Sequence, residues 1–218
     1  MYKAVLCDMD GTLVDSERYY CDGTYHWLKR YGYKGSIEPI YEIIGTTMQE
    51  TYEIIYRLLE GRLSLDEIKE INTQYFYSED RIDYKKYLFK EVPAVLKRLK
   101  KEGYKLALCS ASSYADILRF IEDCDFKDIF DVILSSDDTL AKPHPDIYIK
   151  AMTQLQLDSK EVLIIEDSPY GIRAAKATGA LTLARTSGYL DGKQEEADDK
   201  IKSLDEIFKY IGEKTYAR

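Results

Sequence analysis

The sequence has little of what disulfide-bonded, thiolate-metal or membrane-spanning proteins require. Only four of its 218 residues are cysteine, and no two of them have Cys-x-x-Cys spacing. No apolar run approaches the ~20 residues of a transmembrane helix, and no basic flank precedes an apolar stretch as in a signal peptide. We therefore expect a cytoplasmic protein with reduced thiols and no membrane partner.

Positive charge is also scarce. The chain carries 31 Lys and Arg residues against 39 Asp and Glu residues, a net charge of −8, and it has no basic run or Arg-rich stripe. Binding to a phosphate backbone requires clustered cations, so we expect no nucleic-acid partner.

Apolar stretches of strand length alternate with helical patterns through most of the chain. The stretches are continuously apolar, as in strands covered on both faces, and they span 3–7, 105–110, 131–136, 161–167 and 180–185. The helical patterns between them span 92–103, 113–124, 145–157 and 168–179. This alternation predicts an α/β fold, a doubly wound, Rossmann-like parallel sheet. The charged segment 191–200 is interpreted as a surface loop or a fraying helix.

One interval breaks the alternation. Residues 16–84 show only helical periodicity, and Thr47 with Glu50 and Ser64 with Glu67 have the spacing of capping boxes. We predict a small helical domain over 16–84, inserted after the first strand into a core domain of 1–15 and 85–218. The carboxyl edge of the sheet, where that insert begins, is where open α/β sheets bind ligands.

Pairs of acidic residues end two of the predicted strands. Asp8 and Asp10 follow the first strand, and Glu166 and Asp167 end the fourth. Taken alone, Asp8 to Gly11 could be an ordinary turn. However, carboxylates held close together destabilise one another unless a cation lies between them, and oxygen ligands suit a hard cation such as Mg²⁺.

A serine and a lysine follow the other strands. Ser110 precedes a helix whose N-terminus could bind an anion, although Ser112 or Ser113 could simply cap that helix. Lys142 lies in the proline-stiffened segment AKPHPD, although most lysines are solvated surface charges. We interpret the neighbouring His144 as a turn residue. Because parallel strands end at one edge, all four segments should converge there, with Mg²⁺ and Lys142 balancing the acids.

The chain resembles the haloacid dehalogenase-like (HAD) superfamily, in particular the group similar to β-phosphoglucomutase and small-molecule phosphatases. Four segments carry the resemblance: DMDGT (8–12), CSAS (109–112), AKPHPD (141–146) and IIEDSPYGIRAA (164–175). The helical insert matches the cap domain that this group places after its first strand.

The resemblance implies a role for each of these residues. Asp8 would be the nucleophile that forms an aspartyl phosphate, and Asp10 would be the general acid and base. Mg²⁺ would bind the Asp8 side chain, the Asp10 backbone carbonyl and Asp167, with Glu166 a ligand directly or through water. The residues implied to contact the substrate are Ser110, Ala111 and Lys142 in the core and Gly45 and Thr46 in the cap.

Two positions depart from the mutase pattern. Tyr20 stands where mutase-like members often have a histidine, and Met48 stands where they have an arginine that grips a second phosphate. A thioether cannot bind phosphate. We therefore expect an Mg²⁺-dependent phosphoric monoester hydrolase that acts on a small phosphorylated metabolite. A sugar phosphomutase is the alternative, and a phosphate-binding protein on an inactive scaffold is a third reading.

Overall fold

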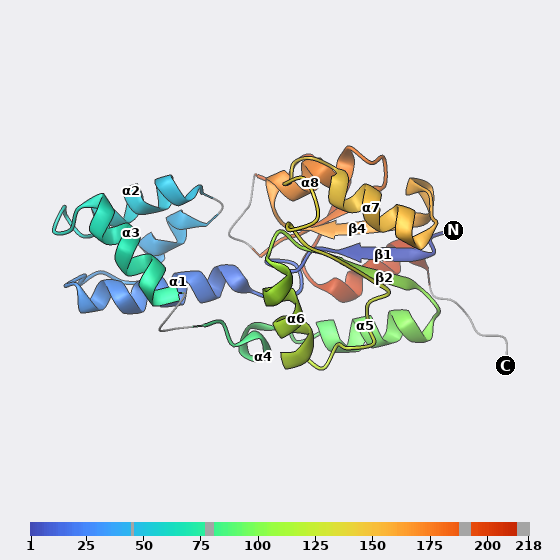
Figure 1. Ribbon diagram of the computed structural model, residues 1–218, viewed down its shortest axis with the longest axis horizontal. Helices are drawn as coiled ribbons and strands as arrows, with labels where there is room; N and C mark the ends of the chain where they lie inside the picture. The colour runs from blue at the N-terminus through green and yellow to red at the C-terminus, as the bar shows by residue number, and fades with distance from the viewer. Residues whose placement is uncertain (45, 77–80, 188–192, 213–218) are drawn as a thin grey trace. The chain divides into compact units, whose positions relative to one another are not determined.

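The computed structural model describes residues 1–44, 46–76, 81–187 and 193–212 (Figure 1). The chain divides into two compact units, one formed by Met1–Val14 with Tyr84–Arg218 and the other by Asp15–Asp83. In the described part of the chain, no helix is long and apolar enough to cross a membrane.

The first unit contains a six-stranded sheet in the order β3-β2-β1-β4-β5-β6, and every neighbouring pair is parallel. The strands are β1 (Ala4–Cys7), β2 (Lys105–Cys109), β3 (Val132–Leu134), β4 (Val162–Glu166), β5 (Leu181–Arg185) and β6 (Asp199–Ile201). The chain builds outward from β1 to β3 and then returns to β4, so the strand order reverses between β1 and β4. In such sheets the ligand crevice lies at this reversal, outside the carboxyl ends of the strands.

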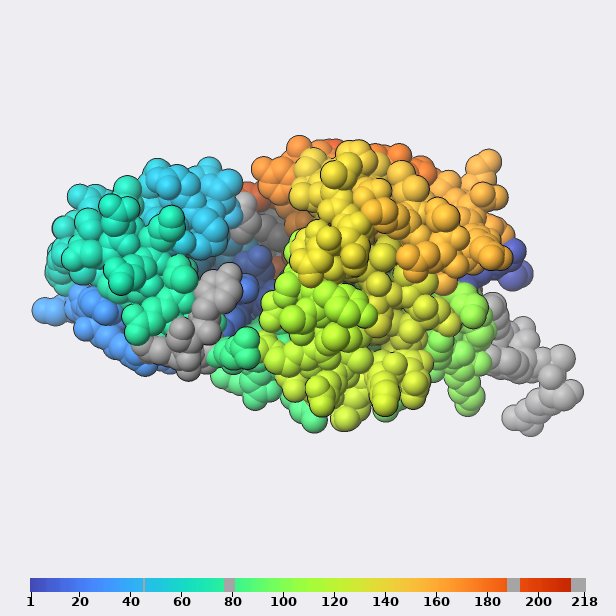
Figure 2. All heavy atoms as spheres, in the orientation of Figure 1, coloured from blue at the N-terminus to red at the C-terminus, as the bar shows by residue number. Residues whose placement is uncertain are grey.

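Helices cover both faces of this sheet, which confirms the predicted doubly wound fold. The helices of this unit are α5 (Val92–Lys101), α6 (Tyr114–Asp123), α7 (Asp146–Leu155), α8 (Pro169–Lys176) and the short α4 (Tyr84–Tyr87) and α9 (Phe208–Ile211), with 3₁₀ turns at Ser159–Glu161 and Leu204–Ile207. In Figure 1, α7 and α8 lie on one face and α5 lies on the other. In Figure 2 the atoms of the helices and loops hide most of the strands, in accord with the fully buried β1 and β4.

The edge strand β6 corrects the interpretation of 191–200 at its C-terminal end, whereas residues 193–198 form turns and bends as a loop would. Residues 199 and 200 pair with β5 instead of forming a loop or a helix, and Asp199 lies opposite Leu183. The strand was missed because only Ile201 of its three residues is buried, which leaves no apolar run to recognise. Residues 191 and 192 lie outside the described part of the chain.

Among the described residues of the second unit, the regular secondary structure is entirely helical. It contains α1 (Ser16–Arg30), a 3₁₀ segment (Glu38–Ile43), α2 (Met48–Leu58) and α3 (Leu65–Gln74). Both predicted capping boxes form: Thr47 caps α2 and Ser64 caps α3, and each is paired reciprocally with a glutamate. Trp27, Leu28, Ile40, Ile55 and Leu59 are buried, giving these helices a shared apolar core.

Candidate active site

Four chain segments meet at the carboxyl edge of the sheet. Asp8 follows β1, Ser110 follows β2, and Asp167 follows β4, whose last residue is Glu166. Since β1 pairs with both β2 and β4, these strand ends are immediate neighbours. Lys142 reaches them from the loop between β3 and α7.

The side chain of Lys142 lies at the centre of these segments. Its Nζ donates hydrogen bonds to Asp8 Oδ1 at 2.6 Å, to Glu166 Oε1 at 2.6 Å and to the carbonyl of Cys109 at 3.0 Å. These three bonds use all three protons of the ammonium group. Burial disfavours the charge, but the two carboxylates outweigh burial and raise the pKa of Lys142 above its ordinary value. Lys142 is therefore a buried counterion and not a solvated surface lysine.

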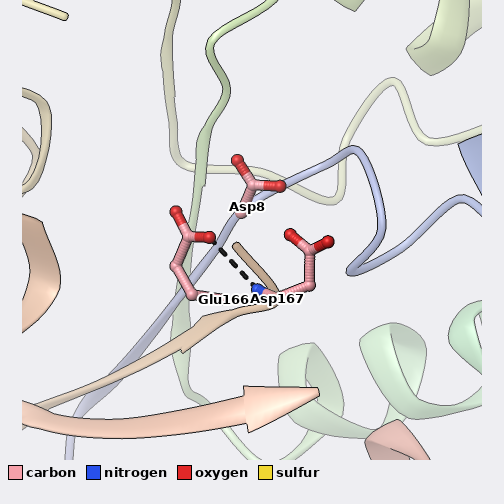
Figure 3. A group of neighbouring side chains, drawn as sticks. All are labelled: Asp8, Glu166 and Asp167. Carbon is pink, nitrogen blue, oxygen red and sulfur yellow. Dashed lines mark hydrogen bonds between the residues drawn. The ribbon is translucent and has the colours of Figure 1, made fainter. Parts of the chain in front are cut away.

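Three buried carboxylates form an oxygen-rich cluster (Figure 3). Asp8, Glu166 and Asp167 each offer a carboxylate oxygen, and these oxygens lie within 4.8 Å of one another. Three negative charges with the single ammonium of Lys142 leave an excess of two, which a divalent cation would neutralise. Carboxylate oxygens are also the ligands that Mg²⁺ prefers. The residues present therefore fit Mg²⁺.

The ionisation of Asp8 depends on such cations. Burial raises the pKa of Asp8 above its ordinary value, and the Glu166 and Asp10 carboxylates raise it further, while Lys142 acts in the opposite direction. A bound divalent cation would add to the effect of Lys142 and favour the charged form.

Glu166 is held by donors on both of its oxygens. Oε1 accepts hydrogen bonds from Lys142 and from the buried hydroxyl of Tyr148 on α7, at 2.6 Å each, and Oε2 accepts one from the backbone N–H of Asp167 at 3.1 Å. A Cβ at position 171 would overlap this carboxylate, so Gly171 in α8 leaves room for it. Tyr148 could not be predicted as a site residue from the sequence, because its only signal there is a place on the apolar face of a helix.

Gly11 shapes the turn that follows Asp8. Its φ is +77°, a conformation that side chains other than glycine rarely adopt, and a Cβ there would overlap the carboxylate of Asp167. The first and fourth motifs therefore pack directly against each other, and a glycine is required at their contact.

The serines after β2 have separate tasks. Ser113 caps α6 by accepting a hydrogen bond from the N–H of Asp116, which decides between the two cap candidates. Ser112 Oγ instead donates to Asp10 Oδ2 at 2.6 Å, a contact that the sequence did not indicate. Ser110 is fully buried and accepts a hydrogen bond from the N–H of Ser112, while Ala111 is exposed.

The other candidate residues are placed as follows. Thr46 lies in the helical unit, where its hydroxyl donates to the carbonyl of Ile43 at 2.7 Å. Gly45 lies outside the described residues. Met48 begins α2 with an exposed side chain. His144 Nδ1 accepts a hydrogen bond from the N–H of Asp146 within its own turn.

Comparison with known proteins identifies the family. Residues 5–184, which include all four motifs, match the haloacid dehalogenase-like hydrolases. The chain belongs to this family. A phosphorylated carbohydrates phosphatase from Thermotoga maritima is 30% identical to the hydrolase over 81% of this chain and 82% of the relative.

Solved structures show the same relationship. The hydrolase is 26% identical to CbbY from Rhodobacter sphaeroides, solved in complex with xylulose-(1,5)bisphosphate, with a TM-score of 0.65 over 95% of this chain and 96% of CbbY. It also shares its fold with β-phosphoglucomutase from Clostridium difficile, at 22% identity and a TM-score of 0.65 over 97% and 96% of the two chains. The predicted resemblance to HAD proteins of the β-phosphoglucomutase group is confirmed.

Proposed function

We propose that this hydrolase is an Mg²⁺-dependent phosphatase that cleaves small phosphate monoesters through an aspartyl phosphate on Asp8. One observation carries the proposal: a buried nucleophile candidate, Asp8, contacts Lys142 and shares a metal-sized oxygen cluster with Glu166 and Asp167. Relatives that are named as a phosphatase and as a pyrophosphatase support hydrolysis of a phosphate bond.

In the first half of this reaction, a carboxylate oxygen of Asp8 forms a bond to phosphorus as the bond from phosphorus to the leaving oxygen breaks. Asp10 gives its proton to that leaving oxygen. Lys142, held by Glu166, counters the negative charge that collects around the phosphoryl group, and Ser110 is proposed to contact the same group.

In the second half, Asp10 takes a proton from a water molecule whose oxygen attacks phosphorus. The bond from phosphorus to Asp8 breaks, inorganic phosphate leaves, and Asp8 returns as a carboxylate. The hydroxyl of Ser112 donates a hydrogen bond to the Asp10 carboxylate, and this bond would orient the carboxylate for proton transfer. Asp8 and Asp167, with the Asp10 backbone carbonyl, would hold Mg²⁺, which supplies further neutralisation of the phosphoryl charge.

The substrate is proposed to be a small phosphorylated carbohydrate. The Thermotoga maritima relative is named for that substrate class, and CbbY was solved with a sugar bisphosphate. We also propose that the helical unit Asp15–Asp83 is the cap that selects the substrate, with Gly45 and Thr46 as contact residues. Met48 provides no cation for a second phosphate, which favours hydrolysis over the mutase reaction.

The test is phosphate release from a panel of sugar phosphates, with Mg²⁺ and with excess EDTA. We expect release to require the metal and Asp8→Asn to lower kcat/KM by about 1,000-fold, roughly 4 kcal/mol of barrier, because an amide is a poor nucleophile. Asp128→Asn, at an exposed acid outside the cluster, is the matched control and should keep full activity.

Three results would contradict the proposal. If the activity of Asp8→Asn stays within about tenfold of wild type, Asp8 is not the nucleophile, since a factor of ten is only ~1.4 kcal/mol. Full activity in EDTA would show that the reaction does not require the metal. Conversion of β-glucose 1-phosphate to glucose 6-phosphate faster than phosphate release would instead support a mutase.

A further inference from the structure

A glutamine is buried within the charged segment that the sequence analysis assigned to the surface. Gln194 is 1% exposed, whereas Lys193, Glu195 and Glu196 beside it are exposed. Burying an amide is unfavourable unless its polar atoms are hydrogen-bonded. The contacts of Gln194 therefore indicate why the chain places an amide at this position.

Both protons of this amide are used at the edge of the sheet. Gln194 Nε2 donates to the carbonyl of Asp167 at 2.6 Å and to the carbonyl of Arg185 at 2.8 Å. A carbonyl oxygen can only accept a hydrogen bond, so the two carbonyls require the NH₂ end of the amide, and not its oxygen, to face them. Oε1 is turned away, and among the described residues it has no hydrogen-bond partner.

These bonds extend the pairing of β4 with β5. The last paired residues of the two strands are Glu166 and Ala184. Asp167 and Arg185 come next, and the glutamine amide joins their two carbonyls where the ladder itself ends. The backbone of Asp167 is thus held by a side chain at the point where its own carboxylate enters the acidic cluster.

Asp167 is also confined on its side-chain end. Its carboxylate occupies the space that a Cβ on Gly11 would take. We propose that Gln194 is a positioning residue for Asp167: by fixing the backbone carbonyl, it keeps the carboxylate against Gly11 and in register with Asp8 for binding Mg²⁺. This inference rests on the proposed metal dependence.

The experiment measures Mg²⁺ binding by isothermal titration calorimetry on the full chain without substrate. Gln194→Met removes both N–H donors with little change of side-chain length. We expect Mg²⁺ to bind about 10- to 100-fold more weakly, the usual effect of losing a group that orients a metal ligand. At saturating Mg²⁺, kcat should return to near the wild-type value, because Gln194 does not contact the substrate in this scheme.

Glu91→Gln is the matched control. Glu91 Oε1 accepts from Arg185 Nη2 at 2.7 Å, so this change loosens the side chain of the residue whose carbonyl Gln194 holds, and leaves Asp167 untouched. It should lower the melting temperature without changing the Mg²⁺ dissociation constant. Gln194→Asn retains an amide but is one methylene too short for both carbonyls, and should give an intermediate affinity.

The outcomes separate this inference from the proposed function. If wild type binds Mg²⁺ and the folded Gln194→Met and Gln194→Asn proteins bind it within about twofold of wild type, the positioning role is wrong and the metal dependence stands. Equal losses in Glu91→Gln and Gln194→Met would indicate general loosening of β5 and also overturn it. A wild-type protein that does not bind Mg²⁺ would overturn both.

Discussion

At the scale of single residues, two glycines determine whether the acidic cluster can form. Gly11 and Gly171 are the positions where a Cβ would overlap the carboxylates of Asp167 and Glu166. The buried carboxylates thus depend on the absence of a Cβ at these two positions as well as on the positive charge of Lys142.

Gly11→Ala tests this requirement. The substitution forces an L side chain into a φ of +77° and into the carboxylate of Asp167, so we expect Mg²⁺ affinity to fall more than about tenfold and phosphatase activity to be lost. Gly103→Ala is a matched control, because Gly103 has a φ of +78° but nothing within 4 Å of the added Cβ.

The two variants separate backbone strain from overlap. Gly103→Ala should lower the free energy of unfolding by about 1–2 kcal/mol through the left-handed backbone alone and leave Mg²⁺ binding unchanged. Denaturant unfolding and metal titration measure both quantities. Equal metal affinities in the two variants would show that Asp167 can move away from Gly11 at no functional cost.

At the scale of elements, helix α8 contains a glycine, a residue with low helix propensity. Gly171 lies inside this helix, where alanine is intrinsically more stable than glycine by about 1 kcal/mol. We nevertheless expect Gly171→Ala to destabilise the protein, because the added methyl overlaps the Glu166 carboxylate that anchors Lys142.

A double-mutant cycle separates the effect of helix propensity at position 171 from the effect of overlap with Glu166. In a Glu166→Ala background the space beside position 171 is free, so Gly171→Ala should become stabilising by roughly 1 kcal/mol, a reversal of sign. Urea unfolding of the four proteins measures the coupling. The same sign in both backgrounds would place the cause elsewhere in α8.

At the scale of the whole molecule, the excess negative charge links stability to the metal. A cation that binds only the folded chain raises its stability by mass action, about 2.7 kcal/mol at a hundredfold excess over the dissociation constant. We expect Mg²⁺ to raise the melting temperature by roughly 5–10 °C in wild type and hardly at all in Asp167→Asn. Differential scanning calorimetry with Mg²⁺ and with EDTA measures this.

The same stabilisation should depend on pH. Because burial raises the pKa of Asp8, its carboxylate takes up a proton at higher pH than an exposed aspartate does. A protonated carboxyl group does not bind the metal, so the Mg²⁺-dependent rise in melting temperature should shrink as the pH falls from neutral to acidic values. A rise that stays constant or grows toward acidic pH would contradict this assignment of Asp8.

The sequence by itself determined five of the six strands described in the sheet, the order of its motifs and the residue types at its carboxyl edge. Continuous apolar runs indicate buried parallel strands, and the carboxyl ends of parallel strands lie at one edge of a sheet, so the sequence alone places Asp8, Lys142 and Asp167 near one another. Capping-box spacing is equally local, which is why the starts of α2 and α3 were correct.

Only the tertiary structure decided the contacts that join residues far apart in the chain. Three hydrogen bonds of the site join such residues: Ser112 bonds to Asp10 across 102 residues, Tyr148 to Glu166 across 18, and Gln194 to Asp167 across 27. Periodicity and spacing describe residues that are neighbours along one helix or strand. They carry no information about which polar atoms of distant segments come into contact in the folded core. Gln194 is a further example: the acidic, polar stretch around it gives no signal of burial, and its amide is held by carbonyls from the ends of β4 and β5.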